Sequence, residues 1–164
     1  MSTGRATISI KLTGDAVGTP MIIYNNGQQL TTTEVGKTVN VNVVPFEKLS
    51  LSIAPKEDNA LVSYDKEKTT FTLNPRMVKT MTYQVNKVLL VFGRLIDENG
   101  KPIAWQRLKG LHSTALTDQF GNFQAELTKN QVMYLQNNSY TCTVALPQVN
   151  HDNVYTYVGD LLCL

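Results

Sequence analysis

The stretch ATISIKL, from Ala6 to Leu12, decides the fold class of this chain. Apolar side chains occupy every second position, and small polar or charged side chains fill the positions between them. This period of two is typical of a β-strand that turns one face toward a core and the other toward solvent. If the same pattern recurs along the chain, the protein is all-β.

The pattern does recur at regular intervals. It is found in TVNVNV (Thr38–Val43), KLSLSI (Lys48–Ile53), FTL (Phe71–Leu73) and MTYQV (Met81–Val85). Turn-forming residues separate these runs, among them Asn25-Asn26-Gly27, Val35-Gly36-Lys37, Pro55 to Asn59 and Asn74-Pro75. Apolar residues at helical spacing do not continue beyond two turns, so no long helix is expected. Short strands at this spacing predict β-sandwiches.

The strand runs divide into two sets, which predicts two tandem small β-sandwich domains. We place the first at residues 1–86 and the second at 87–164, because a complete set of strands precedes the fresh apolar run KVLLVFGRLI. No Pro- or Ser-rich linker marks the junction. Each domain has about 80 residues, a size at which a single hydrophobic core is marginally stable by itself.

Composition excludes several classes of protein. The chain has 164 residues, 42% of them hydrophobic, and a net charge of only +2 with no run of like charges. Neither a nucleic-acid partner nor an anionic membrane surface is indicated. No apolar segment approaches the roughly 20 residues that a membrane-spanning helix needs, so we expect no direct membrane insertion of this chain. The N-terminus lacks a signal peptide, which would suit a fragment of a longer protein.

Two acidic turns organise the second half. Asp97-Glu98-Asn99-Gly100 and Thr117-Asp118-Gln119-Phe120-Gly121-Asn122 both place an aspartate three residues before a glycine. Aspartate accepts backbone N–H groups within turns, and glycine adopts positive φ without strain. A calcium loop would need further oxygen ligands at alternate positions, where this sequence has the bulky Phe120. We therefore expect turns and no metal site.

These turns carry a resemblance to a known fold. The pattern G-x-x-x-D-x-x-G-x-P fits Gly93, Asp97, Gly100 and Pro102, and T-D-x-x-G-x-F fits Thr117 to Phe123. Together they resemble the transthyretin-like, carboxypeptidase-regulatory-type β-sandwich. That resemblance implies a fold for the second domain and leaves its function open.

A wider resemblance extends from about Ser63 to Cys163. TLNPRMVKTMTYQV, VFGRLIDENGKPI, ALTDQFGNFQAEL, YTCTVALP and YVGDLLC follow one another in an order similar to the C-terminal periplasmic region of outer-membrane ushers, closest to those of alternate-chaperone (CS1/CFA-type) fimbriae. The resemblance implies a periplasmic domain of a bacterial outer-membrane protein. Its partners would be chaperone–pilus subunit complexes and the rest of the usher, namely barrel, plug and N-terminal domain. It would act in fimbrial assembly and secretion.

Two other interpretations compete with the usher. A surface adhesin or stalk module could use the same fold for ligand binding or as a spacer. An accessory domain of a hydrolase would have its catalytic domain elsewhere. No nucleophile elbow, phosphate-binding loop or zinc-protease motif occurs, and we expect His112 and His151 to be solvent-exposed loop residues. The chain is thus not expected to be an enzyme or to hold a cofactor.

Cys142 and Cys163 are the only cysteines. They can pair in one way, and a disulfide would imply an oxidising compartment; two buried free thiols are the alternative. A zinc site lacks further ligands at suitable spacing.

Four apolar residues of the second half are candidates for partner contact. Tyr155 and Tyr157 share one face of the strand VYTYV, and the leucines that follow, Leu161 among them, would extend an apolar surface. Trp105, the only tryptophan, is expected to fill the second core beside Ile103, with an exposed partner anchor as the alternative.

Overall fold

The structure is a computed structural model of the whole chain that describes residues 4–110, 114–129, 131–136, 141–144 and 155–163. These residues form strands and turns without any α-helix, so the all-β prediction is confirmed. None of them belongs to a helix with the length and apolar character that crossing a bilayer requires. The chain consists of two compact units, Met1–Lys87 (unit 1) and Val88–Leu164 (unit 2).

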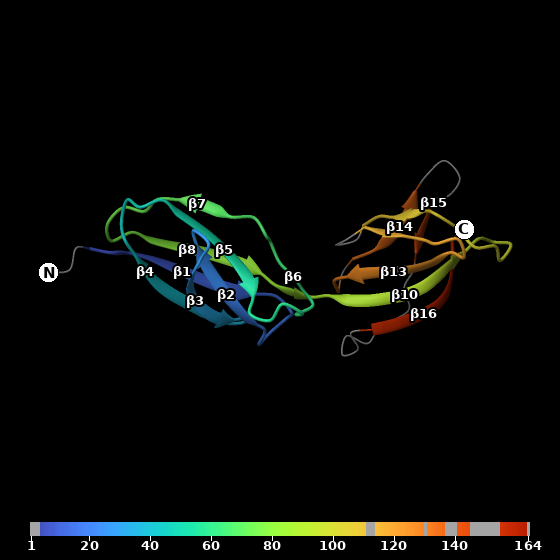
Figure 1. Cartoon of the computed structure of the whole chain (residues 1–164), viewed down its shortest axis with the longest axis horizontal. Coiled ribbons are helices and arrows are strands. Elements are labelled where there is room, and N and C mark those ends of the chain that lie inside the picture. Colours follow the sequence, from blue (N-terminus) through green and yellow to red (C-terminus); the bar gives the residue numbers. More distant parts are fainter. Residues whose placement is uncertain (1–3, 111–113, 130, 137–140, 145–154, 164) are drawn as a thin grey trace. The chain divides into compact units, whose positions relative to one another are not determined.

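Unit 1 is built from two main sheets (Figure 1). In the three-stranded sheet, β1 (Ala6–Thr13) lies between β4 (Thr38–Val43) and β8 (Val78–Gln84), antiparallel to β4 and parallel to β8. The antiparallel sheet has the order β3-β2-β5-β7, with bounds Gln28–Glu34, Pro20–Asn25, Leu49–Pro55 and Thr69–Phe71. A short pair joins β6 (Val62–Ser63) to β9 (Asn86–Lys87).

The hairpin between β2 and β3 shows how sequence sets register. Asn25 pairs with Gln28 across a two-residue turn of Asn26 and Gly27, whose φ angles are 52° and 79°. Positive φ at both positions is the requirement of a type I′ turn, and Asn-Gly is the dipeptide that meets it at least cost. The predicted turn at Asn25-Asn26-Gly27 is confirmed.

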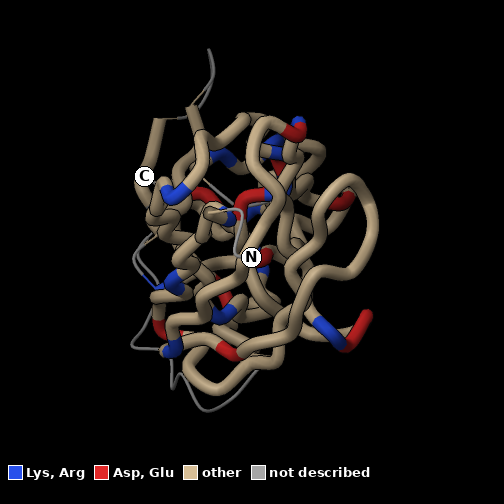
Figure 2. Tube along the Cα trace, turned by 90° about the vertical axis from the view of Figure 1, so that its left-hand side faces the viewer, with Lys and Arg blue, Asp and Glu red and all other residues tan. Residues whose placement is uncertain are grey.

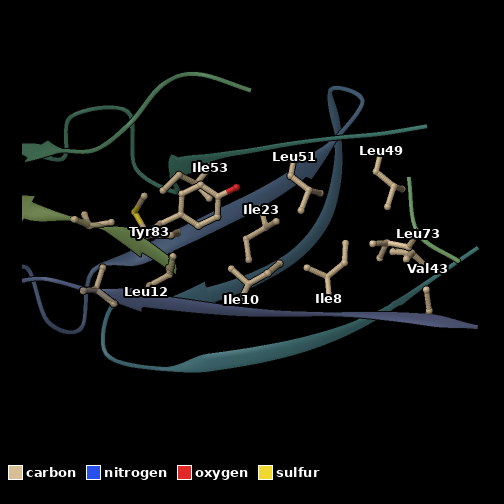
Figure 3. Close-up of a cluster of buried hydrophobic side chains, with 14 of the residues drawn as sticks. Ile8, Ile10, Leu12, Ile23, Val43, Leu49, Leu51, Ile53, Leu73 and Tyr83 are labelled. Atoms are coloured by element: carbon tan, nitrogen blue, oxygen red, sulfur yellow. The ribbon is translucent and has the colours of Figure 1, made fainter. Parts of the chain in front are cut away.

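The core of unit 1 lies between its two main sheets. Ile8, Ile10 and Leu12 of β1 face Ile23, Leu51 and Ile53 of the antiparallel sheet, and all six are buried (Figure 3). Between them on β1, Ser9 and Lys11 lie on the opposite face, as the period of two predicts. Tyr83 closes one end, where burial raises the pKa of its hydroxyl above 10.0; the side chain of Thr69 opposes the rise without reaching hydrogen-bond geometry.

Unit 2 has a three-stranded sheet in which β10 (Leu89–Ile96) lies between β13 (Asn122–Leu127) and β16 (Tyr155–Leu162). It is antiparallel to β13 and parallel to β16. Two short pairs, β11 (Arg107–Leu108) with β12 (Ala115–Leu116) and β14 (Met133–Gln136) with β15 (Thr141–Val144), are joined by a bridge from Lys109 to Tyr134. The second layer thus has the order β12-β11-β14-β15.

The core of unit 2 is a second, separate cluster. Its central members are Val91 and Leu95 of β10, Phe123 and Leu127 of β13, and Met133 of β14. Gly93 lies among them without a side chain, and a Cβ there would come within 2.9 Å of the Phe123 ring. The glycine therefore leaves room for that ring in the core.

Both units follow the same strand topology. In each, the first strand is the centre of a three-stranded sheet, with an antiparallel neighbour on one side and the last main strand, β8 or β16, parallel on the other. The remaining four main strands form the facing antiparallel layer in equivalent order, β3-β2-β5-β7 in unit 1 and β12-β11-β14-β15 in unit 2. Equivalent faces of the two units can thus be compared directly.

Candidate functional site: an aromatic sheet face on unit 2

The acidic stretches that could have suggested a metal site are turns of one design. Asp97 accepts the backbone N–H groups of Asn99 and Lys101 through Oδ1, both at 2.9 Å. Asp118 accepts those of Phe120 and Asn122 in the same way, at 2.8 and 2.9 Å. In both turns the glycine three residues later donates its N–H to the carbonyl of the aspartate, and that glycine has positive φ. The turn prediction for both stretches is confirmed.

The hydrogen bonds at Asp118 favour its charged form. Desolvation pushes the pKa of this carboxyl upward, but the backbone N–H groups of Asn122 and Phe120 and the Asn122 side chain outweigh it, and the pKa lies below the ordinary 3.8. Asp118 therefore orders its own turn. In the described part of the chain, no group of three or more His, Cys, Asp or Glu side chains is placed to hold a metal ion.

A disulfide joins Cys142 of β15 to Cys163, which directly follows β16. The Cα atoms are 5.4 Å apart, within the usual range for a bridge. Cys163 is buried and Cys142 packs against the same core. The predicted pairing is confirmed, and it ties together the last strands of the two layers of unit 2.

The outer side of the sheet β13-β10-β16 carries a group of large apolar side chains, which we name the aromatic face. It is formed by alternate residues of the central and last strands: Leu90, Phe92, Arg94 and Ile96 of β10, and Tyr155, Tyr157, Asp160 and Leu162 of β16. Asn122, Gln124 and Glu126 of β13 form its polar border.

The two tyrosine rings of this face are exposed to solvent, and one of them stacks on Phe92. Tyr155 is 66% exposed and Tyr157 is 74% exposed. The Phe92 ring stacks on that of Tyr155, with centroids 6.3 Å apart. Tyr157 is the register partner of Phe92, so it lies beside Phe92 on the same face. If β16 turned these tyrosines toward the core, both rings would be buried.

Arg94 lies on the central strand of the aromatic face, and its Nε is buried without a hydrogen-bond partner. Its register partner on β16 is Asp160, yet the ion pairs of the described residues do not include one between these two. A desolvated donor with no acceptor costs free energy in the isolated unit. Sequence reasoning missed both Arg94 and Phe92, because they lie in an apolar run that reads as a fully buried strand.

Leu161 was expected to share the surface of Tyr155 and Tyr157, and this expectation is wrong. Only 9% of it is exposed, and it packs in the core of unit 2 opposite Leu95. The cause is a bulge in β16 between the partners of Phe92 and Arg94, where Gly159 has a φ of 73°. One extra residue reverses the alternation, so Leu161 turns inward and Asp160 and Leu162 turn outward.

Trp105 was expected to fill the core beside Ile103, and this is also wrong. Ile103 is buried, but Trp105 is 62% exposed. Its φ of 57° takes the backbone out of the extended conformation, so the alternation that would have paired it with Ile103 does not apply. Trp105 is thus available for a contact, as the alternative had it.

Charged residues of both signs are interspersed along the chain (Figure 2).

The two histidines expected to lie in solvent-exposed loops, His112 and His151, fall outside the described residues.

Comparison with known proteins finds one matching family and several relatives. Residues 73–164, more than half of the chain, match the family model described as CS1-pili formation C-terminal. The chain is 25% identical, over 94% of its length, to the probable outer membrane usher protein EcpC of Escherichia coli O157:H7. It is 27% identical, over 78% of its length, to the EcpC protein of E. coli O127:H6. It spans only 20% and 16% of the lengths of these two relatives.

A solved structure resembles the fold. The whole chain aligns with 20% of one chain of the cryo-EM structure of the E. coli P pilus tip assembly intermediate PapC-PapD-PapK-PapG, with a TM-score of 0.65 and 16% sequence identity. At that identity the likeness concerns the fold.

Proposed function

This chain belongs to the CS1-pili formation C-terminal family, and from that premise we propose that it is the periplasmic C-terminal region of an outer-membrane usher. Its function is to bind complexes of a periplasmic chaperone with pilus subunits during fimbrial assembly. The observation that carries the proposal is the family match, together with the similarity of nearly the whole chain to EcpC proteins named as probable ushers. That similarity favours an usher over an adhesin, a stalk module or the accessory domain of a hydrolase.

Two structural features support this proposal. The disulfide between Cys142 and Cys163 suits an oxidising compartment such as the periplasm. The aromatic face offers tyrosine and arginine side chains, the residue types that contribute most to protein–protein contacts. The chain acts in this proposal by binding, without a catalytic group or a cofactor.

The proposal is tested in two steps. The purified 164-residue chain, immobilised, should retain the chaperone–subunit complex of its own pilus system and leave free chaperone of an unrelated system unbound. Deletion of the region from the complete usher should abolish surface pili while the amount of usher in the outer membrane stays unchanged. Failure of the chain to retain its own chaperone–subunit complex, or normal piliation of the deletion strain, would contradict the assignment.

A further inference from the structure

The two units contain an internal comparison that bears on the aromatic face. The sheet β4-β1-β8 of unit 1 is topologically equivalent to the sheet β13-β10-β16 of unit 2. Its outer side consists almost entirely of small polar or charged residues: Thr7, Ser9, Lys11, Thr13, Thr38, Asn40, Asn42, Thr80, Thr82 and Gln84, with Val78 as the exception. This fold is therefore stable with a polar outer face.

An apolar outer face on unit 2 is thus not a requirement of the topology. The outer side of the edge strand β16 exposes Tyr155, Tyr157 and Leu162. Exposed apolar side chains on an edge strand favour unwanted association, which natural sheets usually prevent with charged residues. Rings that stack on each other, as Phe92 and Tyr155 do, are held in place before any partner arrives. Such preordered aromatic side chains lose little conformational entropy on binding.

Arg94 shows which chemistry the partner brings. It lies on the same face between Phe92 and Ile96, its Nε is buried and unpaired, and Asp160 does not neutralise it. Because the side chain as a whole is only partly buried, a carboxylate on the partner would complement its charge. A neutral acceptor, such as a backbone carbonyl, would leave that charge uncompensated.

We propose that the aromatic face is the docking surface of unit 2 for a protein segment that presents a carboxylate to Arg94, flanked by apolar side chains that cover Phe92, Tyr155 and Tyr157. The proposal rests on the proposed function, in which this segment belongs to the chaperone–subunit complex. The aromatic rings supply the contact area, and Arg94 fixes the orientation of the partner.

The test measures binding of the purified chaperone–subunit complex to the whole 164-residue chain. Replacing Tyr155 and Tyr157 together by serine should weaken binding about tenfold or more, because central aromatic anchors dominate interfaces of this kind. Phe46→Ser in unit 1 is the matched control, since it removes a ring that is 70% exposed elsewhere in the chain. The control should bind as the natural chain does.

Arg94 is tested through salt dependence, which a merely structural role would not change. Binding of the natural chain should weaken as NaCl rises from about 50 to about 500 mM, since a partly exposed ion pair is screened. Arg94→Gln should bind more weakly at low salt and lose most of this dependence. Arg94→Lys, which retains the charge, should keep the dependence, and thermal unfolding of each variant verifies that unit 2 is folded.

The outcomes separate the two proposals. If the natural chain binds the complex and the tyrosine and Arg94 variants bind equally well, the docking surface is wrong and the proposed function stands. If the natural chain binds no complex, the proposed function fails and the docking proposal with it. If the variants instead change the oligomeric state of the chain by itself in sedimentation, the face is a contact between copies, and the proposal is overturned.

Discussion

At the residue scale, two turns of unit 2 each use an aspartate and a glycine in the same structural roles. Asp97 with Gly100 and Asp118 with Gly121 build the same turn from four equivalent hydrogen bonds. The two glycines differ in their surroundings. A Cβ at Gly121 would lie 2.5 Å from the carbonyl oxygen of Leu95, whereas a Cβ at Gly100 would meet nothing within 4 Å.

This difference predicts unequal effects of the same substitution. Gly100→Ala imposes only the cost of positive φ, about 1 kcal/mol. Gly121→Ala adds a clash with backbone, and we expect it to destabilise unit 2 by about 3 kcal/mol or more. Urea unfolding followed by circular dichroism measures both variants. Equal losses for the two would contradict the close approach of Gly121 to Leu95.

Asp118 predicts a dependence of stability on pH. Its pKa in the folded chain lies below 3.8, so its contribution is present above the pKa of the unfolded chain and is lost as pH falls through the folded value. Between about pH 5 and pH 2 the natural chain should therefore lose stability more steeply than Asp118→Asn, which cannot ionise there. Unfolding midpoints across this range decide it, and parallel curves for the two proteins would show that the charge of Asp118 does not matter.

At the scale of elements, the disulfide links β15 to the end of β16 and so holds the two layers of unit 2 together. It closes a loop with a sequence separation of 21, for which chain entropy predicts about 3 kcal/mol. Replacing Cys142 and Cys163 together by alanine should lower the stability of unit 2 by about that amount. Calorimetry should show the unfolding transition of unit 2 moved to lower temperature and that of unit 1 unchanged. A shift of both transitions would mean that the effect reaches unit 1.

Strand positions could be predicted from sequence because side chains alternate wherever the backbone stays extended. ATISIKL became β1 and TVNVNV became β4 for this reason. The prediction failed where one residue breaks the alternation. The bulge next to Gly159 moved Leu161 into the core, and positive φ at Trp105 turned that ring outward. Neither event leaves a signal in the hydrophobic pattern, although the glycine inside VYTYVGDLL is a typical mark of a bulge.

The aromatic face itself could be predicted only in part. Tyr155 and Tyr157 lie on one side of β16, as their spacing indicated, and are exposed. Phe92 and Arg94 belong to the apolar run of β10, where only the pairing with β16 reveals which side faces outward. Long-range pairing of strands is information that periodicity within one segment does not contain.

The whole molecule consists of two units with the same topology and separate cores. We therefore propose the junction of Lys87 and Val88 as the domain boundary. Fragments 1–87 and 88–164, produced separately, should each give a cooperative thermal transition and the circular dichroism of a β-protein. A fragment that is unfolded in isolation, while the whole chain is folded, would contradict independent domains.

In both units the first strand pairs with the last main strand; in unit 2, for example, Leu90 of β10 is the register partner of Tyr155 of β16. A contact between segments so far apart along the chain raises the contact order, and such topologies fold slowly. During synthesis the middle strand of each three-stranded sheet keeps one edge unpaired until the last main strand of its unit has left the ribosome. Unit 2 thus exposes the unpaired edge of β10 for most of its translation. Because unpaired strand edges promote aggregation, incomplete forms of unit 2 are the kind of chain that chaperones bind.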